Sequence, residues 1–391
     1  MDFNSLFSNE KVNTGRQKEL DIIRVVAIVV MILIHTSITV MNFQNSETNE
    51  FLFVLDMLLG SGAAVFILIM GIVMSYSRHN TPNELIRRGI VLLLLGFFVN
   101  IGEYILPHFL SCYLFNDASL VNIYNGVMLF YVDILGFASM ALILMGILRK
   151  LKISNKHLLL LAIAMSLIGS FVRCIDFNNP VLNTLLGYFI ATNYLFTAFP
   201  LFVWFIFPAV GYVYGQYYIR CKDKSRFFKY WPLFIIIGSL YFLITIFTGG
   251  YMSSDETYYF LNTLDVIFIL IDIHGLFGLG YVLSKKLPEA IVRFLTLVSK
   301  NLTRIYIAQW FLIPVTVILT HYFLPEMVFS DLTVVLLGMF LIVMSVLVAF
   351  AFNKVKKLDW KNLSYPLKSD QHSFSFFIVL FVSYSPKILI N

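Results

Sequence analysis

Charged residues are scarce in this sequence. They make up 13% of its 391 residues, whereas hydrophobic residues make up 59% and the mean hydropathy is +0.83. Soluble domains contain about 25% charged residues and rarely exceed 50% apolar residues. This composition excludes a water-soluble enzyme, a disordered chain and a nucleic-acid-binding protein, despite the pI of about 9.0. We therefore predict an integral, multi-pass membrane protein whose surroundings are membrane lipid.

Cysteine is also rare, and long polar stretches are missing. Three cysteines imply no disulfide framework, and with seven histidines they form no ligand-spaced cluster, so we expect no metal site. Residues 1–21 are polar and carry charges of both signs, which is not the pattern of a cleavable signal peptide. We interpret them as a cytoplasmic arm. No polar stretch is long enough for a separate soluble domain.

The sequence instead contains long apolar segments. A helix needs about 20 mostly apolar residues to cross the hydrocarbon core. Ten segments meet this requirement, which predicts an all-α, polytopic bundle of about ten transmembrane helices. The predicted spans cover 22–43, 51–77, 88–106, 127–148, 158–176, 197–219, 231–249, 260–284, 304–324 and 332–353.

Nearly all Lys and Arg residues fall into alternate connections between these spans. Because cytoplasmic loops collect positive charge, this alternation places both ends of the bundle in the cytoplasm. Arg173 is the exception on the opposite side. The basic groups occupy the N-terminal arm, the loops 78–88, 149–156, 220–229 and 285–304, and the stretch after residue 353.

Two apolar stretches do not fit the ten spans. Residues 181–196 are short and interrupted, which is typical of an interfacial or re-entrant segment. Residues 374–390 either form an eleventh span or lie along the interface. We therefore divide the chain into the arm 1–21, a transmembrane domain 22–353 and a cytoplasmic or interfacial tail 354–391. We find no internal repeat.

The first span carries two ionisable residues, Arg24 and His35, separated by ten residues. Eleven residues of helix rise about 16 Å and bring His35 within roughly 20° of Arg24, so both lie on one face. Arg binds phosphate in a bidentate manner, and a neutral imidazole accepts a proton near pH 7. The pair therefore favours an anionic cofactor at the membrane surface and proton transfer deeper in the bilayer. Alternatively, Arg24 is a positive anchor and His35 is a packing residue.

Other polar residues near or within the spans are weaker candidates. Arg87 and Arg88 either extend a phosphate-binding surface beside Arg24 or are plain loop charges. Asp272 and His274 lie near the middle of the eighth span, and Asp133 lies less deep in the fourth. Ionisable groups inside a span are costly and mark function or a paired structural site. Asp272 and His274 are two positions apart, so they face different directions and need not pair.

Three motifs resemble those of the acyltransferase 3 family. The Arg24–x10–His35 spacing, with Asp21 ahead of the arginine, matches its first-span signature. The segment 65–71 followed by the arginine pair is similar to its Phe-rich motif and downstream Arg motif, and Ser299–Tyr306 is similar to the start of a late span. The related heparan-glucosaminide acetyltransferase group has patterns close to 68–71 and 199–204.

Some positions depart from the family pattern, and they weaken the later motifs more than the first. Met70 replaces the usual Ser, and Val25 replaces a small residue. Gln309 occupies a position where many relatives have His before a Trp-Pro pair, and here Trp310 is followed by Phe311. The resemblance covers roughly residues 16–353.

The resemblance implies an enzyme of the plasma membrane, by analogy a bacterial one. His35 would be the catalytic base, and Arg24 would help to hold acyl-CoA, with acetyl-CoA the expected donor. The acceptor would be a hydroxyl of a cell-surface or lipid-linked carbohydrate. Asp133, Asp272 and His274 receive no role from the resemblance and are candidate polar groups of the cavity.

Two alternatives to an acyltransferase stay open. One is a transporter or flippase for a lipid-linked glycan, with the same acidic residues and His274 lining its pathway. Many transporters are built from two related halves, so the lack of a visible repeat counts against it. The other is a structural or sensor protein, in which His35 would be replaceable.

Overall fold

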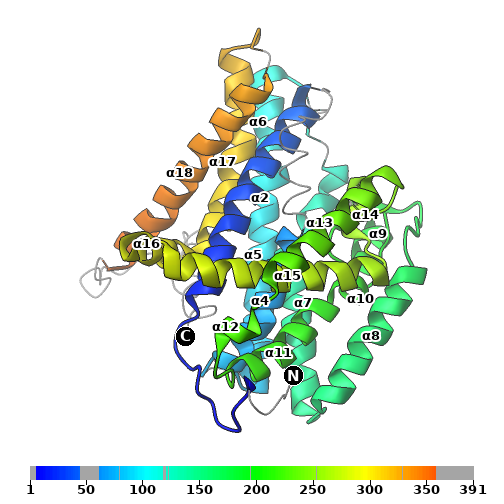
Figure 1. Ribbon diagram of the computed structural model, residues 1–391. Coiled ribbons are helices and arrows are strands. Elements are labelled where there is room, and N and C mark those ends of the chain that lie inside the picture. The colour runs from blue at the N-terminus through cyan, green and yellow to red at the C-terminus, as the bar shows by residue number, and fades with distance from the viewer. Residues whose placement is uncertain are drawn as a thin grey trace, which may run out of the picture.

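The structure is a computed structural model that describes residues 6–44 and 61–357, except 79, 118–119, 122, 194, 252 and 328. The hydrophobic stretch 374–390 and most of the predicted tail lie outside these residues. The described chain is helical, with two isolated β-bridges and no longer strand (Figure 1). The longer helices are α2 (Lys18–Gln44), α4 (Gly62–Tyr76), α5 (Pro82–Asn100), α6 (Leu106–Phe115), α7 (Ile134–Lys150), α8 (Asn155–Phe171), α11 (Ile206–Tyr218), α13 (Trp231–Phe247), α15 (Thr263–Lys286), α16 (Glu289–Ser299), α17 (Leu302–Phe323) and α18 (Asp331–Lys357).

Every one of the ten predicted spans contains helix, and six helical stretches are long and apolar enough to cross a membrane. α4 and α8 are apolar but shorter. The helical, multi-pass character is therefore confirmed, whereas ten spans remain a prediction. The six stretches are Lys18–Phe43, Pro82–Phe115, Lys224–Phe247, Thr263–Lys286, Leu302–Phe323 and Asp331–Phe352.

Proline explains why the predicted span 197–219 is not one helix. It divides at Phe205 into α10 (Leu201–Trp204) and α11. Pro208 has no N–H to donate to the carbonyl of Trp204, so the regular hydrogen-bond ladder is interrupted at this point. The stretch 181–196 contains only α9 (Pro180–Gly187), which at eight residues is too short to cross a bilayer.

A π-helical turn, η1 (Ile101–Ile105), joins α5 and α6 into one continuous rod. Its cause is again a proline. Pro107 cannot donate a hydrogen bond to the carbonyl of Glu103 four residues earlier, and a wider turn accommodates this missing bond. The turn also approaches α17 closely, because a Cβ atom on Gly102 would lie 2.6 Å from the ring of Phe311.

The first predicted span lies at the centre of the packing. α2 contacts α4, α15, α16, α17 and α18, and Figure 1 shows it between α17 and α15. A second close pair is α4 and α11, which meet at Gly71 and Gly211. A Cβ atom on either glycine would overlap backbone atoms of the other helix. Small residues permit such close helix contacts inside membranes.

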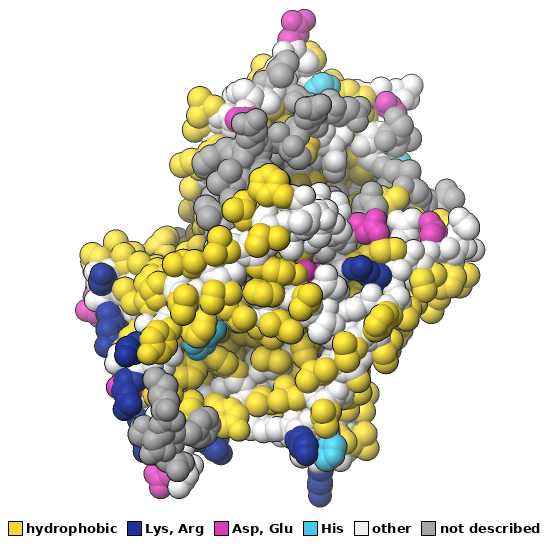
Figure 2. Space-filling model, turned by 45° about the vertical axis from the view of Figure 1, so that its right-hand side comes forward, with side chains coloured by type: hydrophobic (Ala, Val, Ile, Leu, Met, Phe, Trp, Pro, Cys, Tyr) yellow, Lys and Arg dark blue, Asp and Glu magenta, His cyan; other side chains and the backbone are white. Residues whose placement is uncertain are grey.

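Connections rich in positive charge meet at one end of the bundle. Figure 2 shows Lys and Arg side chains gathered toward the lower end of the molecule, around a surface that is otherwise largely hydrophobic. This grouping agrees with a common side for these connections, although their orientation to the membrane remains a prediction. Contacts that join them include Lys224 Nζ to Glu19 Oε1 (2.6 Å), Ser299 Oγ to Asp21 Oδ1 (2.6 Å), Ser8 N to Arg220 O (2.9 Å) and the hydrogen bond from Arg149 to Asn80 O.

Candidate functional site

His35 on α2 contacts two consecutive residues of α17. Its half-buried ring stacks on Trp310, with ring centroids 4.3 Å apart and an interplanar angle of 27°. The Nε2 atom of Gln309 lies 3.2 Å from His35 Nδ1. Aromatic stacking on one side and an amide at one nitrogen restrict the rotation of the imidazole. The ring is therefore held in position from a neighbouring helix.

The Gln309 amide determines which imidazole nitrogen is available for chemistry. Its side chain is fully buried, and its Oε1 atom accepts no hydrogen bond from the described residues. An amide offers a donor and an acceptor that exchange places on rotation by 180°. As placed, the amide nitrogen donates to Nδ1, and a neutral ring then carries its proton on Nε2. In the rotated orientation Oε1 accepts the proton of Nδ1, the buried oxygen is satisfied, and Nε2 carries the lone pair.

Tyr306 extends this arrangement to Asp133. Its hydroxyl donates to Asp133 Oδ2 at 3.1 Å, and its ring meets Trp310 edge to face at 6.4 Å. The other oxygen of Asp133 caps α7 by accepting from the N–H groups of Leu135 (2.9 Å) and Gly136 (2.8 Å). One face of α17 thus connects His35 with Asp133. The structure brings these two predicted residues into one site, which the sequence did not predict.

Glu103 is a half-buried acid that the sequence analysis passed over. It lies in the π-turn η1, hydrogen-bonds Tyr104, and is close enough to Asp133 for an electrostatic interaction. Its Oε2 atom is buried and has no hydrogen-bond partner among the described residues. π-turns occur often at functional sites. The available signal was a glutamate inside an apolar span, which is costly unless it has a function.

Arg24 lies near the start of α2 and is half-buried. Its nearest acid along the helix, Asp21, is already engaged by Arg16 through Nε (2.6 Å) and Nη2 (2.8 Å) and by Ser299 Oγ. Within the part of the chain that the structure describes, no side chain forms a hydrogen bond or ion pair with the Arg24 guanidinium. Its charge is therefore available to an anion.

Comparison with protein families identifies the chain. Residues 16–244, more than half of the sequence, match the model for "Heparan-alpha-glucosaminide N-acetyltransferase, catalytic". The chain belongs to this family. The matched region contains Arg24, His35, Glu103 and Asp133, whereas α17 lies outside it. No curated protein and no solved structure matches the chain.

Membership confirms the predicted relation to the heparan-glucosaminide acetyltransferase group and indicates an acetyltransferase-type enzyme in a membrane. The likeness to the acyltransferase 3 family stays a resemblance of motifs. Within the described residues of this family member, no three His, Cys, Asp or Glu side chains lie together as a metal site would require.

Arg87 and Arg88 lie on a different helix from Arg24. Both lie on the first turns of α5, where Arg87 is exposed and Arg88 is half-buried. α5 packs mainly on α7, whereas α2 is surrounded by other helices. A phosphate surface shared by all three arginines therefore has no direct support in the packing.

Asp272 and His274 have separate surroundings, as their spacing predicts. Asp272 is buried, accepts a hydrogen bond from Ser61 Oγ at 2.6 Å, and packs against Gly238. His274 Nδ1 lies 3.3 Å from the hydroxyl of Tyr214. Neither residue contacts the cluster around His35 among the interactions of the described chain. The imidazole of His274 is surrounded by the rings of Tyr214, Phe227, Phe228 and Phe234.

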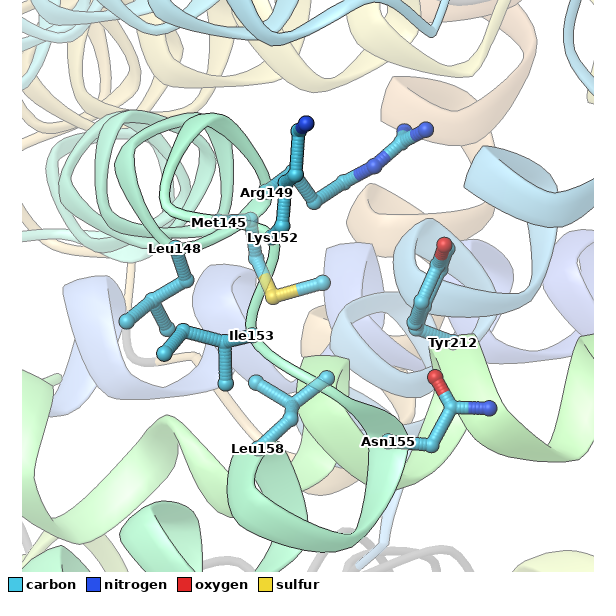
Figure 3. Close-up of a pocket in the computed structure, with 8 residues that line it drawn as sticks. All are labelled: Met145, Leu148, Arg149, Lys152, Ile153, Asn155, Leu158 and Tyr212. Carbon is cyan, nitrogen blue, oxygen red and sulfur yellow. The ribbon is translucent and has the colours of Figure 1, made fainter.

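A small pocket of about 150 Å³ opens at the basic end of the bundle, between α7, α8 and α11 (Figure 3). Arg149 lies over the ring of Tyr212 there, 5.6 Å from its centroid, and Lys152 lines the same pocket. Asp133 and Arg149 are at opposite ends of α7, about 24 Å apart along the helix. The pocket is therefore distinct from the cluster around His35.

Proposed function

We propose that this family member transfers an acyl group, acetyl in the first instance, from acyl-CoA to a hydroxyl of a cell-surface or lipid-linked carbohydrate. The observation that supports this most strongly is the position of His35, stacked on Trp310 and contacted at Nδ1 by Gln309. With the Gln309 amide in its rotated orientation, Nε2 is the basic atom of this ring.

The reaction needs one base and no oxidant or reductant. His35 Nε2 takes the proton of the acceptor hydroxyl, and the oxygen attacks the carbonyl carbon of the thioester. The carbon–sulfur bond breaks, and the departing CoA thiolate takes the proton from the imidazolium. The sugar ester and CoA are the products. Tyr306 and Asp133 anchor α17 to α7 beside the ring.

Arg24 is the proposed contact for the phosphates of acyl-CoA. A guanidinium offers a planar pair of donors to a phosphate, and the acid one turn before it is engaged elsewhere. From Arg24 to His35 the helix rises about 16 Å, so the acyl arm would follow α2 toward the imidazole. Arg87 and Arg88 are secondary candidates for the same role. No metal is needed for this chemistry.

The test is acyl transfer by the full-length protein in detergent or vesicles. Labelled acetyl-CoA is offered with sugar acceptors that present either a hydroxyl or an amine, and the product bond is identified. His35→Ala should lower the rate by roughly 10²- to 10⁴-fold, the usual contribution of a general base. His157→Ala, an exposed histidine at the start of α8, is the matched control. Unchanged transfer in His35→Ala would refute the proposal, and loss of glycan export with transfer intact would favour the transporter.

Arg24→Gln provides the second arm of the test. Loss of a charge-assisted hydrogen bond costs about 1.5–3 kcal/mol, so KM for acyl-CoA should rise by at least roughly tenfold with a smaller change in kcat. Arg87→Gln and Arg88→Gln show whether those residues share the role. An unchanged KM in Arg24→Gln would remove Arg24 from the donor site.

A further inference from the structure

A basic groove lies between the N-terminal arm and α16, at the charged end of the bundle. It has a volume of about 380 Å³ and is lined by the cations of Arg16, Lys18, Arg293 and Lys300, with the hydroxyl of Thr296 among them. No acidic residue lines it. The groove is outside the cluster around His35, and the proposed function assigns it no role.

Two acids near the groove reduce its charge without cancelling it. Asp21 pairs with Arg16, and Glu289 approaches Arg293 at 3.8 Å between two exposed side chains. An exposed pair at that distance contributes little. Lys18 and Lys300 form no ion pair within the described chain, so the groove keeps a positive potential. Asp21 also fixes the position of the Arg16 guanidinium.

The helix that forms one wall of the groove is amphipathic and lies across the bundle. In Figure 1, α16 continues from α15 beside the lower end of α2 and does not run along that helix, and α16 and α2 are in contact. Its buried side is formed by Val292 and Val298, while the apolar side chains of Ile291, Phe294 and Leu297 are 44–55% exposed. A helix with exposed apolar residues and flanking cations is typical of one lying in the membrane interface.

We propose that this groove binds the headgroup of an anionic phospholipid. The phosphate would lie among Arg16, Lys18, Arg293 and Lys300, and the acyl chains would run along the exposed apolar residues of α16, of which Leu297 also lines the groove. A soluble phosphate compound would use the cations but not the adjacent apolar surface. This apolar surface is the reason for assigning a lipid.

The experiment compares lipid binding by the full-length protein purified in neutral detergent, using native mass spectrometry and thermal unfolding. The probes are phosphatidylglycerol, phosphatidylcholine and CoA, each titrated separately. The variant is Arg293→Gln combined with Lys300→Gln. The control is Lys285→Gln combined with Lys286→Gln, which removes the same charge from exposed positions outside the groove lining.

A cation near the membrane surface contributes about fivefold to the binding of an anionic lipid, so the groove variant should retain phosphatidylglycerol roughly 25-fold more weakly. The control should retain phosphatidylglycerol almost as strongly as the parent protein does. Phosphatidylcholine should bind weakly to all three proteins. Equal retention by the groove variant and the control would overturn the proposal. Weakened binding of CoA, with phosphatidylglycerol unaffected, would also overturn it and assign the groove to the donor. Midpoints of unfolding without lipid verify that both variants fold, and acyl transfer by the same proteins reports separately on the proposed function.

Discussion

Gln309 on α17 and His35 on α2 approach each other across 274 positions of sequence, with 3.2 Å between the amide nitrogen and Nδ1. The amide is fully buried, whereas the imidazole is only half-buried. Since a buried amide has no water to bond with, its position depends on the ring, and the position of the ring depends on it.

Replacing Gln309 should therefore impair catalysis without preventing donor binding. Gln309→Leu leaves His35 Nδ1 without its partner, at a cost of about 1–3 kcal/mol, and should lower kcat by roughly ten- to a hundredfold. KM for acyl-CoA should change little. Gln309→His can again present a nitrogen to the ring and should keep more activity. Steady-state kinetics on the three proteins checks this, and equal kcat in Gln309→Leu and the parent protein would contradict it.

The hydrogen bond from Tyr306 to Asp133 should be measurable as stability. Tyr306→Phe keeps the ring against Trp310 but removes the donor to Oδ2. We expect a loss of about 1 kcal/mol in the free energy of unfolding. Tyr113→Phe is the matched control, because Tyr113 is 86% exposed. The interpretation fails if both variants unfold at the temperature of the parent protein.

The contact of α4 with α11 leaves no room for a side chain at Gly71. A Cβ atom there would lie 2.8 Å from the backbone nitrogen of Tyr212 and closer still to Pro208. Gly71→Ala should destabilise the protein by about 1–3 kcal/mol, the usual cost of overpacking. Gly62→Ala on the same helix has open space and should have little effect. Thermal unfolding of the two variants gives the comparison, and similar losses in both would contradict the assigned contact.

The hydrogen bonds of Asp176, in the loop after α8, predict that the stability of this loop depends on pH. Hydrogen bonds from the side chains of Asn183 and Asn193 (2.8 Å each) and from the backbone of Asn178 stabilise its charged form and hold the pKa of the carboxyl below its ordinary value. A lowered pKa in the folded state stabilises the loop above the ordinary value of about 3.9, and this stabilisation is lost as the pH falls through the folded pKa.

Hydrogen exchange of this loop measures the effect. Asp176→Ala should exchange faster than the parent protein near pH 6, and the difference should shrink as the pH falls below about 4. Glu326→Ala, at an exposed position in another loop, should not change exchange there. A difference that stays constant from pH 6 to pH 3 would show that the charge of Asp176 is not the cause.

Hydropathy predicted the position of the helices because a backbone inside lipid must satisfy its own hydrogen bonds. It did not predict α16, since charge was the only property read from the loop 285–304, and this helix is apolar on just part of its surface. Arg304 illustrates the same point: it was counted as a loop charge, yet it is 3% exposed in the first turn of α17.

Only part of the site could be predicted from the sequence, because the sequence pattern of one helix does not show which helices pack against it. Arg24 and His35 lie on one helix, so their spacing alone relates them. Gln309, Trp310 and the link from Tyr306 to Asp133 depend on how α17 packs against α2 and α7, and helical periodicity within a single span carries no information about its neighbour. Asp272 and His274 were weaker candidates than His35 in sequence, and the structure gives them partners of their own.

The π-turn η1 joins two helices, α5 and α6, that pack against different neighbouring helices. Before it α5 packs on α7, and after it α6 packs on α17. A π-turn contains one residue more than an α-helix would use over the same rise. Deleting a single residue from 101–105 should therefore give a regular helix in which α5 and α6 keep their present faces, whereas straightening the turn with all five residues kept would rotate α6 by about 100° relative to α5. Thus the wide turn, by taking up one extra residue, keeps the faces of the two helices that flank Glu103 in register.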